Sequence, residues 1–297
     1  MKTLRKRFPI LISIVLTVLF PLIAVPAARP LAAFGDFFAD NLYLAQLIAE
    51  IMTFAVFLIL AVLMGLGFIF RRSRKPVRQL LVPCTAILVI YSISLLGNLS
   101  LSLGYPLQPS LKILWFLLCM LSVGLTEELV FRGMITRMLF AKYGRNPVGV
   151  WFSVLLSGLL FGLMHLSYAY GGIIDLKSVL VQVVGACMLG ICLGAIYLRT
   201  DSYWTVALLH AFMDFCGLFS SGVFTVDTLT DTLGSYSAVN LVSVIPYLAI
   251  GLVLLRPGKM RTVTDPNGQA SQGQIIGLMI TVMLIAGLIS AVTVLSV

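Results

Sequence analysis

The sequence predicts an all-α, polytopic membrane protein of about eight or nine transmembrane helices, with a core bundle that carries a polar site. Hydrophobic residues make up 60% of the 297-residue chain and charged residues only 10%, against about 25% charged residues in an ordinary soluble domain. The mean hydropathy is +1.07. Helices are the expected form of each apolar run, because a segment in lipid must satisfy its own backbone hydrogen bonds.

Nine apolar segments divide the chain at the intervals expected of membrane spans. They cover residues 8–27, 42–70, 80–103, 111–132, 148–168, 173–198, 204–224, 241–255 and 275–297. The fourth segment is expected to end at a loop over residues 134–146.

The charges between these segments alternate along the chain. Basic runs precede the first segment and follow the second, fourth, sixth and eighth, whereas most charges in the intervening loops are acidic. By the positive-inside rule this pattern predicts a cytoplasmic N-terminus and a C-terminus on the outer side. The net charge of +9 therefore follows from membrane orientation, and no nucleic-acid partner is expected.

The N-terminal region allows two interpretations. A basic start, an apolar run and the sequence Val25-Pro-Ala-Ala28 are typical of a cleaved signal peptide as well as of a retained helix; we favour the retained helix. Residues 32–50 combine three phenylalanines with two aspartates, and we expect them to lie along the outer membrane interface.

Two adjacent carboxylates, Glu127 and Glu128, lie in the fourth apolar segment. A carboxylate at membrane depth is expensive and is usually retained for a task or a partner. Glu128 and Arg132 are four residues apart, so they share a helix face and are expected to form an ion pair that closes the cytoplasmic end of the helix. Glu127 is rotated by about 100° from Glu128 and is left without this partner, which favours a chemical role.

Both histidines of the chain also lie in apolar segments. His165 alone is explained equally well as a neutral imidazole that joins two helices, and Gly158 and Gly162 on its segment permit close approach of a neighbouring helix. His210 and Asp214 share a helix face, where a local hydrogen bond would satisfy both groups.

Together, these polar groups favour amide hydrolysis in one of two forms. Converging glutamate, histidine and aspartate side chains can bind a divalent metal that activates water. Without a metal, a glutamate–histidine unit can activate water while other groups stabilise the oxyanion. One difficulty is depth: with a helix start at 148, His165 lies about 25 Å along its helix, towards the far leaflet from Glu127.

The three motifs, Glu127-Glu128-x-x-x-Arg132, Phe161-x-x-x-His165 and His210-x-x-x-Asp214, resemble the signature of the CPBP family. This family comprises CAAX-type proteases and bacteriocin-processing (Abi) proteins. The resemblance implies an intramembrane endopeptidase whose eukaryotic members remove the last three residues of prenylated proteins. It implies that Glu127 is the general base, with His165 assisting it or binding metal, and that His210 and Asp214 bind metal or face the oxyanion. Glu128 and Arg132 would hold the helix and tune Glu127.

The resemblance leaves the cofactor open. The family's third motif ends in Asn or Asp, and an ionised Asp214 cannot donate to an oxyanion. His165, His210 and Asp214 are therefore expected as ligands of a divalent metal, with zinc the first choice, although a metal-free reaction stays possible.

The family suggests a division into N-terminal helices (1–110), a catalytic helical core (111–224) and C-terminal helices (225–297). The expected protein is an integral component of a bacterial cell membrane that acts on a membrane-bound protein or peptide within the lipid bilayer. Two alternatives stay open: a catalytically silent scaffold or immunity-type factor, and a proton-coupled transporter, for which intramembrane carboxylates and histidines are also typical.

Overall fold

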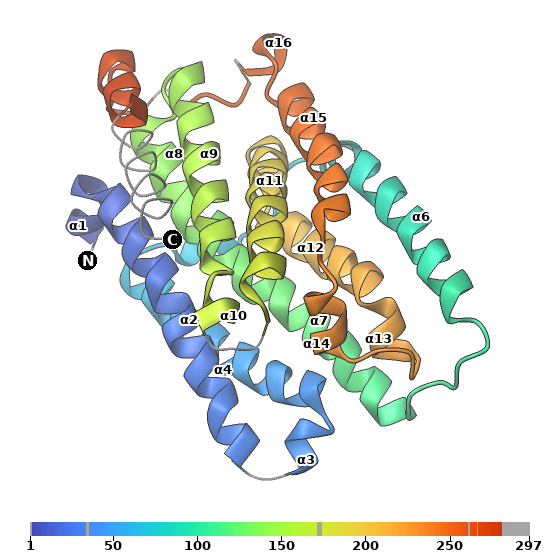
Figure 1. Ribbon diagram of the computed structural model, residues 1–297. Helices are drawn as coiled ribbons and strands as arrows, with labels where there is room; N and C mark the ends of the chain where they lie inside the picture. The colour runs from blue at the N-terminus through green and yellow to red at the C-terminus, as the bar shows by residue number, and fades with distance from the viewer. Residues whose placement is uncertain (1, 34–35, 171–173, 261, 266, 281–297) are drawn as a thin grey trace, which may run out of the picture.

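The computed structural model describes residues 2–33, 36–170, 174–260, 262–265 and 267–280, and over these residues the chain is almost entirely helical (Figure 1). No strand occurs in these ranges; an isolated bridge joins Leu107 and Phe224. The chain is thus an all-α polytopic membrane protein, as predicted.

In the described part of the chain, ten helical elements form the bundle. They are α2 (Pro9–Ala33), α4 (Leu42–Leu63), α6 (Thr85–Ser102), α7 (Ser110–Glu128), the π-helical stretch η3 (Leu129–Thr136), α8 (Arg137–Tyr143), α9 (Pro147–Met164), α11 (Leu176–Thr200), α12 (Tyr203–Gly217) and α15 (Val244–Leu254). The remaining elements are short and connect or flank these helices: α1 (Lys2–Arg7), α3 (Asp36–Ala39), η1 (Gly67–Phe70), α5 (Val77–Leu81), η2 (Val82–Cys84), α10 (Ser167–Tyr170), α13 (Phe219–Val223), α14 (Leu229–Gly234), η4 (Ala238–Ser243) and α16 (Pro257–Met260).

Five helical segments in the described part of the chain are long and apolar enough to cross a membrane. They are Leu42–Leu63, Val77–Ser102, Ser110–Tyr143, Pro147–Ala169 and Leu176–Thr200. Two shorter apolar helices, Pro9–Ala24 and Ala238–Leu254, accompany them. The last predicted segment, 275–297, lies outside the described residues from 281 onward.

The predicted end of the fourth segment at residue 132 is wrong. The helix continues through η3 and α8 to Tyr143, so most of the expected loop at 134–146 is helical. Arg132 does not mark the end of the apolar part, because its charge is paired with Glu128 and fully buried. The longer helix also removes the difficulty with the depth of His165. Glu127 and His165 lie at similar distances along the chain from the turn at Gly144, one before it and one after it, so both reach a similar depth in the bundle.

The placement of residues 32–50 along the outer interface is also wrong from Leu42 onward, where the chain enters α4. The α4 helix packs on α7, and Glu50 is buried at this contact. The side chain of Phe20 on α2 lies against Phe57 of α4 and Phe131 of η3, with ring centroids 5.7 and 6.1 Å apart. The first segment is therefore part of the packed bundle, and its retention in the mature protein stays a prediction.

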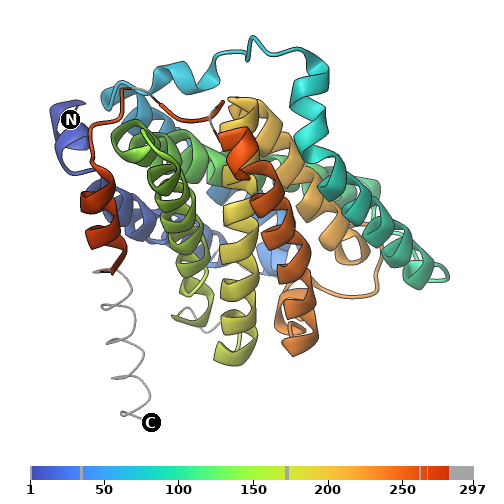
Figure 2. The same ribbon diagram turned by 90° about the horizontal axis from the view of Figure 1, so that it is seen from above.

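The α7 helix lies between α4 and α12, and α9 packs against α11, which also contacts α15 (Figures 1 and 2). Several basic loops meet at one end of this bundle: Lys75 Nζ donates to Arg199 O at 2.6 Å, and Arg199 donates to Lys259 O at 3.3 Å. This clustering is what the positive-inside rule requires of a cytoplasmic face, and the orientation itself stays a prediction.

Glycines allow α9 and α11 to approach closely, as the sequence predicts. A Cβ at Gly158 would lie 2.8 Å from Ile191 N, and one at Gly190 would lie 2.8 Å from Gly158 Cα. A Cβ at Gly162 would lie 2.6 Å from Val183 O. Small residues at such contacts are the usual means of helix association in membranes.

We expect Gly158→Ala to destabilise the protein by about 1–3 kcal/mol, because the added methyl group meets backbone atoms that cannot move aside. Gly185→Ala on α11 is the matched control, since a Cβ there meets nothing within 4 Å. The midpoints of thermal unfolding in detergent measure both changes. Equal midpoints for the two variants would contradict this account of the α9–α11 contact.

Candidate active site

The first motif lies where α7 changes into the π-helical stretch η3. Wide π turns inside α-helices are rare and often coincide with functional sites. Phe131 O accepts hydrogen bonds from Thr136 Oγ1 at 2.8 Å and from Ser157 Oγ at 3.0 Å. These two hydroxyl groups supply donors to a carbonyl in the distorted stretch and fasten η3 to α9.

A buried network joins the first motif to the third. Glu128 Oε1 accepts from Arg132 Nη1 at 2.6 Å and lies 2.8 Å from His210 Nδ1. Glu128 and Arg132 are fully buried, and His210 is 3% exposed. Because a carboxylate only accepts, His210 donates its Nδ1–H here, and its Nε2 is directed elsewhere.

The Arg132 guanidinium also contacts two further helices. Nη2 donates to Gly190 O on α11 at 3.3 Å, and the group lies 4.5 Å above the ring of Phe161 on α9. The ion pair that was expected to close a helix end therefore lies inside the bundle. Arg132 connects η3 with α9 and α11, and Glu128 connects α7 with α12.

Two carboxylates lie near the other nitrogen of His210. Nε2 is 3.8 Å from Glu127 Oε2 and 3.7 Å from Asp214 Oδ2. Both distances exceed a direct hydrogen bond, so the local His210–Asp214 bond considered from the sequence does not form, and Glu128 takes the imidazole N–H instead. Glu127 is buried, whereas the Asp214 side chain is 27% exposed.

His165 lies beside this group at the end of α9. Its Nδ1 is 3.0 Å from Phe161 O, to which it donates, and this fixes the ring. The Phe161 ring contacts both imidazoles, with centroids 5.2 Å from His165 and 5.8 Å from His210, and His165 interacts electrostatically with His210. The structure places Glu127, Glu128 and Asp214 within 3.8 Å of the His210 nitrogens, whereas in the described residues no hydrogen bond or ion pair joins His165 to them.

The predicted metal ligands His165, His210 and Asp214 do not fit a metal ion as they are arranged. Over the part of the chain that the structure describes, no group of three or more His, Cys, Asp or Glu side chains lies close enough together to hold one. Zinc requires ligand atoms about 2.0–2.3 Å from the ion, and in the described residues His165 is not grouped with His210 and Asp214 at such distances. No role below is therefore assigned through a metal.

Two residues near the site are absent from the sequence prediction. Glu50 on α4 is buried, and it interacts electrostatically with Glu127, His210 and Asp214. Tyr168 follows His165, with ring centroids 5.9 Å apart, and is in electrostatic range of Glu127. The available signal for Glu50 was its carboxylate in the otherwise uncharged apolar segment 42–70.

The unpartnered polar atoms of this region are mostly acceptors. In the described residues, Glu50 Oε2 and Glu128 Oε2 are buried carboxyl oxygens without a hydrogen bond, and Arg132 Nε is a donor without one. Buried polar atoms usually have a partner in the protein, in water or in a ligand. Such atoms are therefore available to form hydrogen bonds with water or with a ligand.

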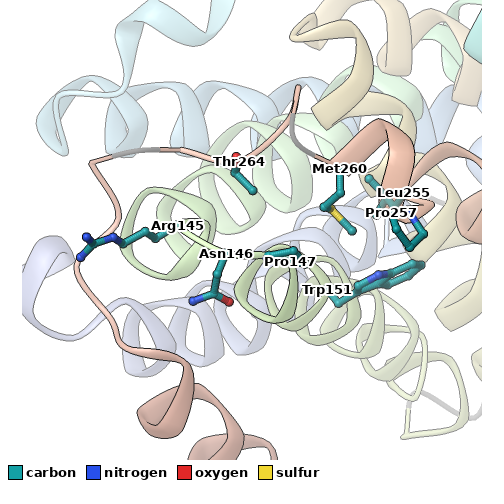
Figure 3. A pocket seen from close by; sticks show the side chains of 8 residues that line it. All are labelled: Arg145, Asn146, Pro147, Trp151, Leu255, Pro257, Met260 and Thr264. Carbon is teal, nitrogen blue, oxygen red and sulfur yellow. The ribbon is translucent and has the colours of Figure 1, made fainter.

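A cavity of about 570 Å³ lies at the end of the bundle, away from this site (Figure 3). Its wall includes Asn146, Trp151, Leu255 and Met260, and the Arg145 side chain extends away from these residues (Figure 3). The wall contains none of the motif residues, so the cavity is not part of the candidate active site.

The fold and the site together define a polytopic helical membrane protein with a buried carboxylate–imidazole centre. Residues 109–216 match the family model described as type II CAAX prenyl endopeptidase Rce1-like. The match includes all three motifs and confirms the resemblance over somewhat more than a third of the chain. At the level of the family, this region is similar to CAAX-protease-like membrane endopeptidases. A comparison of the chain with curated proteins finds no match.

We expect Arg132→Met to destabilise the protein by about 3–5 kcal/mol, because it leaves the Glu128 carboxylate buried without its ion pair. The double variant Glu128→Gln with Arg132→Met should be more stable than the single one, since the glutamine still accepts from His210 and leaves no buried charge. Thermal unfolding in detergent compares the two. A double variant as unstable as the single one would show that the ion pair does not carry this cost.

Proposed function

We propose that the protein is an intramembrane endopeptidase in which Glu127 activates the attacking water. The observation that carries the proposal is the position of Glu127, a buried carboxylate whose Oε2 lies 3.8 Å from His210 Nε2. This gap is too long for a direct hydrogen bond, but it allows both groups to contact one water molecule. General-base catalysis requires such hydrogen-bond reach between a carboxylate and the water that it deprotonates.

In the proposed reaction Glu127 takes one proton from water, and the resulting hydroxide oxygen bonds to the carbonyl carbon of the substrate. The carbon–nitrogen bond then breaks, and Glu127 returns the proton to the leaving nitrogen. His210 donates Nδ1–H to Glu128 and, when protonated at Nε2 as well, offers a second N–H to the oxyanion. Asp214 orients the Nε2 side of the ring, and His165 flanks the reacting carbonyl from α9.

The substrate class follows from the family match. We propose a membrane-bound protein or peptide whose lipid-modified C-terminal tail enters the bundle from the bilayer, as the description CAAX prenyl endopeptidase suggests. A suitable probe is a farnesylated peptide that ends in Cys-aliphatic-aliphatic-X, with a fluorophore released on cleavage. Peptides without the farnesyl group test whether the lipid is required.

We expect Glu127→Gln to reduce cleavage of this peptide by at least about 10³-fold, because the amide cannot accept the proton from water. Asp231→Asn is the matched control, since Asp231 is an exposed acid held only by local bonds to Thr228. Both variants should unfold at the wild-type temperature in detergent. Cleavage at the wild-type rate by Glu127→Gln would reject Glu127 as the general base, whereas a wild-type protein that cleaves no such peptide would favour a silent scaffold that retains the fold.

The proposed roles contain no metal-bound step, so we expect cleavage to persist after dialysis against EDTA or 1,10-phenanthroline. Metal analysis of the purified protein accompanies the assay. Loss of activity with chelator and its recovery on adding Zn²⁺ would contradict these roles and favour the divalent metal predicted from the sequence.

A further inference from the structure

Glu50 is a buried carboxyl group that the proposed reaction leaves unused. Its side chain lies on α4, and the residue is only 2% exposed. Oε1 accepts a hydrogen bond from Gln46 Nε2 at 2.7 Å. Oε2 is buried without a hydrogen bond from any described residue, which costs free energy unless water or a ligand supplies a donor.

The Glu50 carboxyl group interacts with Gln46, one turn earlier on the same helix, and with the Thr126 side chain on α7. The single hydroxyl proton of Thr126 is directed to backbone carbonyls, since Oγ1 lies 2.8 Å from Ser122 O and 3.3 Å from Glu50 O, and Glu50 Oε2 is left without a donor. A residue with an apolar side chain would keep that backbone contact, so packing alone does not explain a carboxylate here.

Glu50 lies close to the candidate active site. Thr126 directly precedes Glu127, and the contact between Thr126 and Glu50 therefore brings α4 next to the proposed general base. Glu50 interacts electrostatically with Glu127, and also with His210 and Asp214 on α12. Its unpartnered oxygen thus belongs to the same polar region as the three motifs.

A peptide substrate brings the donors that this region lacks. Main-chain N–H groups of a peptide that enters a membrane-enclosed site leave bulk water, so they need acceptors from the protein. A carboxyl oxygen accepts hydrogen bonds and is well suited to this task. Of the two unpartnered carboxyl oxygens, the one on Glu50 belongs to a group that the buried ion pair does not use.

We propose that Glu50 Oε2 accepts a hydrogen bond from a main-chain N–H of the bound substrate and so positions the scissile peptide bond against Glu127. This inference rests on the proposed endopeptidase function and adds a substrate-binding residue to it. Glu50 then acts in binding the peptide backbone, which is present in every peptide substrate whatever its side chains.

The test pairs a protein variant with a change in the substrate. The farnesylated peptide is compared with analogues in which one main-chain N–H at a time, outside the scissile bond, is replaced by an ester oxygen. With the wild-type protein, one analogue should lose about 10-fold or more in kcat/KM, the effect of one hydrogen bond to a charged group. Glu50→Met, which keeps the length of the side chain but has no oxygen acceptor, should lower kcat/KM for the all-amide peptide by a similar factor, mainly through KM, and should not distinguish that analogue from the amide.

Gln46→Ala serves as the control, because it removes the donor to Oε1 and leaves Oε2 in place. It should retain the preference for the amide over the sensitive ester analogue. A wild-type protein that treats every ester analogue like the amide overturns the inference without any variant. The inference also fails if Glu50→Met retains the wild-type amide preference.

The two proposals fail in different ways. If the wild-type protein cleaves none of the peptides, the endopeptidase assignment fails. Binding of the same peptides, followed by fluorescence anisotropy, then decides the contact: a loss of affinity for one ester analogue in the wild-type protein but not in Glu50→Met supports it, and equal affinities overturn it.

Discussion

The buried ion pair between Glu128 and Arg132 is the interaction on which the arrangement of the site depends. Its guanidinium contacts Gly190 O on α11 and the Phe161 ring on α9, while the carboxylate reaches His210 on α12. In a low-dielectric interior neither charge tolerates the loss of its partner. The helices that carry the three motifs are therefore held in one relative position by a single pair of charges and its neighbours.

This pair also separates the roles of two adjacent glutamates. A rotation of about 100° between successive residues on a helix directs Glu128 into the network and Glu127 towards the Nε2 side of His210. Glu128 Oε1 is held by two donors at 2.6 and 2.8 Å, whereas the nearest ion-pair partner of Glu127 is 3.8 Å away. A carboxylate that is not held by strong hydrogen bonds remains available to accept a proton.

The sequence predicted the fold class and the Glu128–Arg132 pair, because hydropathy and the i, i+4 spacing are local properties of the chain. It placed the end of the fourth segment at Arg132 because a charge normally leaves the membrane, and here the charge is neutralised by the residue one turn earlier. The His210–Asp214 hydrogen bond was considered as an alternative for the same local reason. The structure gives the imidazole N–H to Glu128 on another helix, a contact that spacing along the chain does not encode.

Glu50 is a residue of the site that the sequence alone could not identify. One carboxylate in a long apolar segment fits an interfacial position as well as a buried one, and only the packing of α4 on α7 distinguishes them. With Glu50 included, carboxylates from three helices interact with His210, and two of them, Glu127 and Asp214, lie within 3.8 Å of its Nε2. The nearby arginine is engaged by Glu128. A region with such an excess of acceptors favours a ligand rich in N–H donors, and the backbone of a peptide has this property whereas an anionic solute does not.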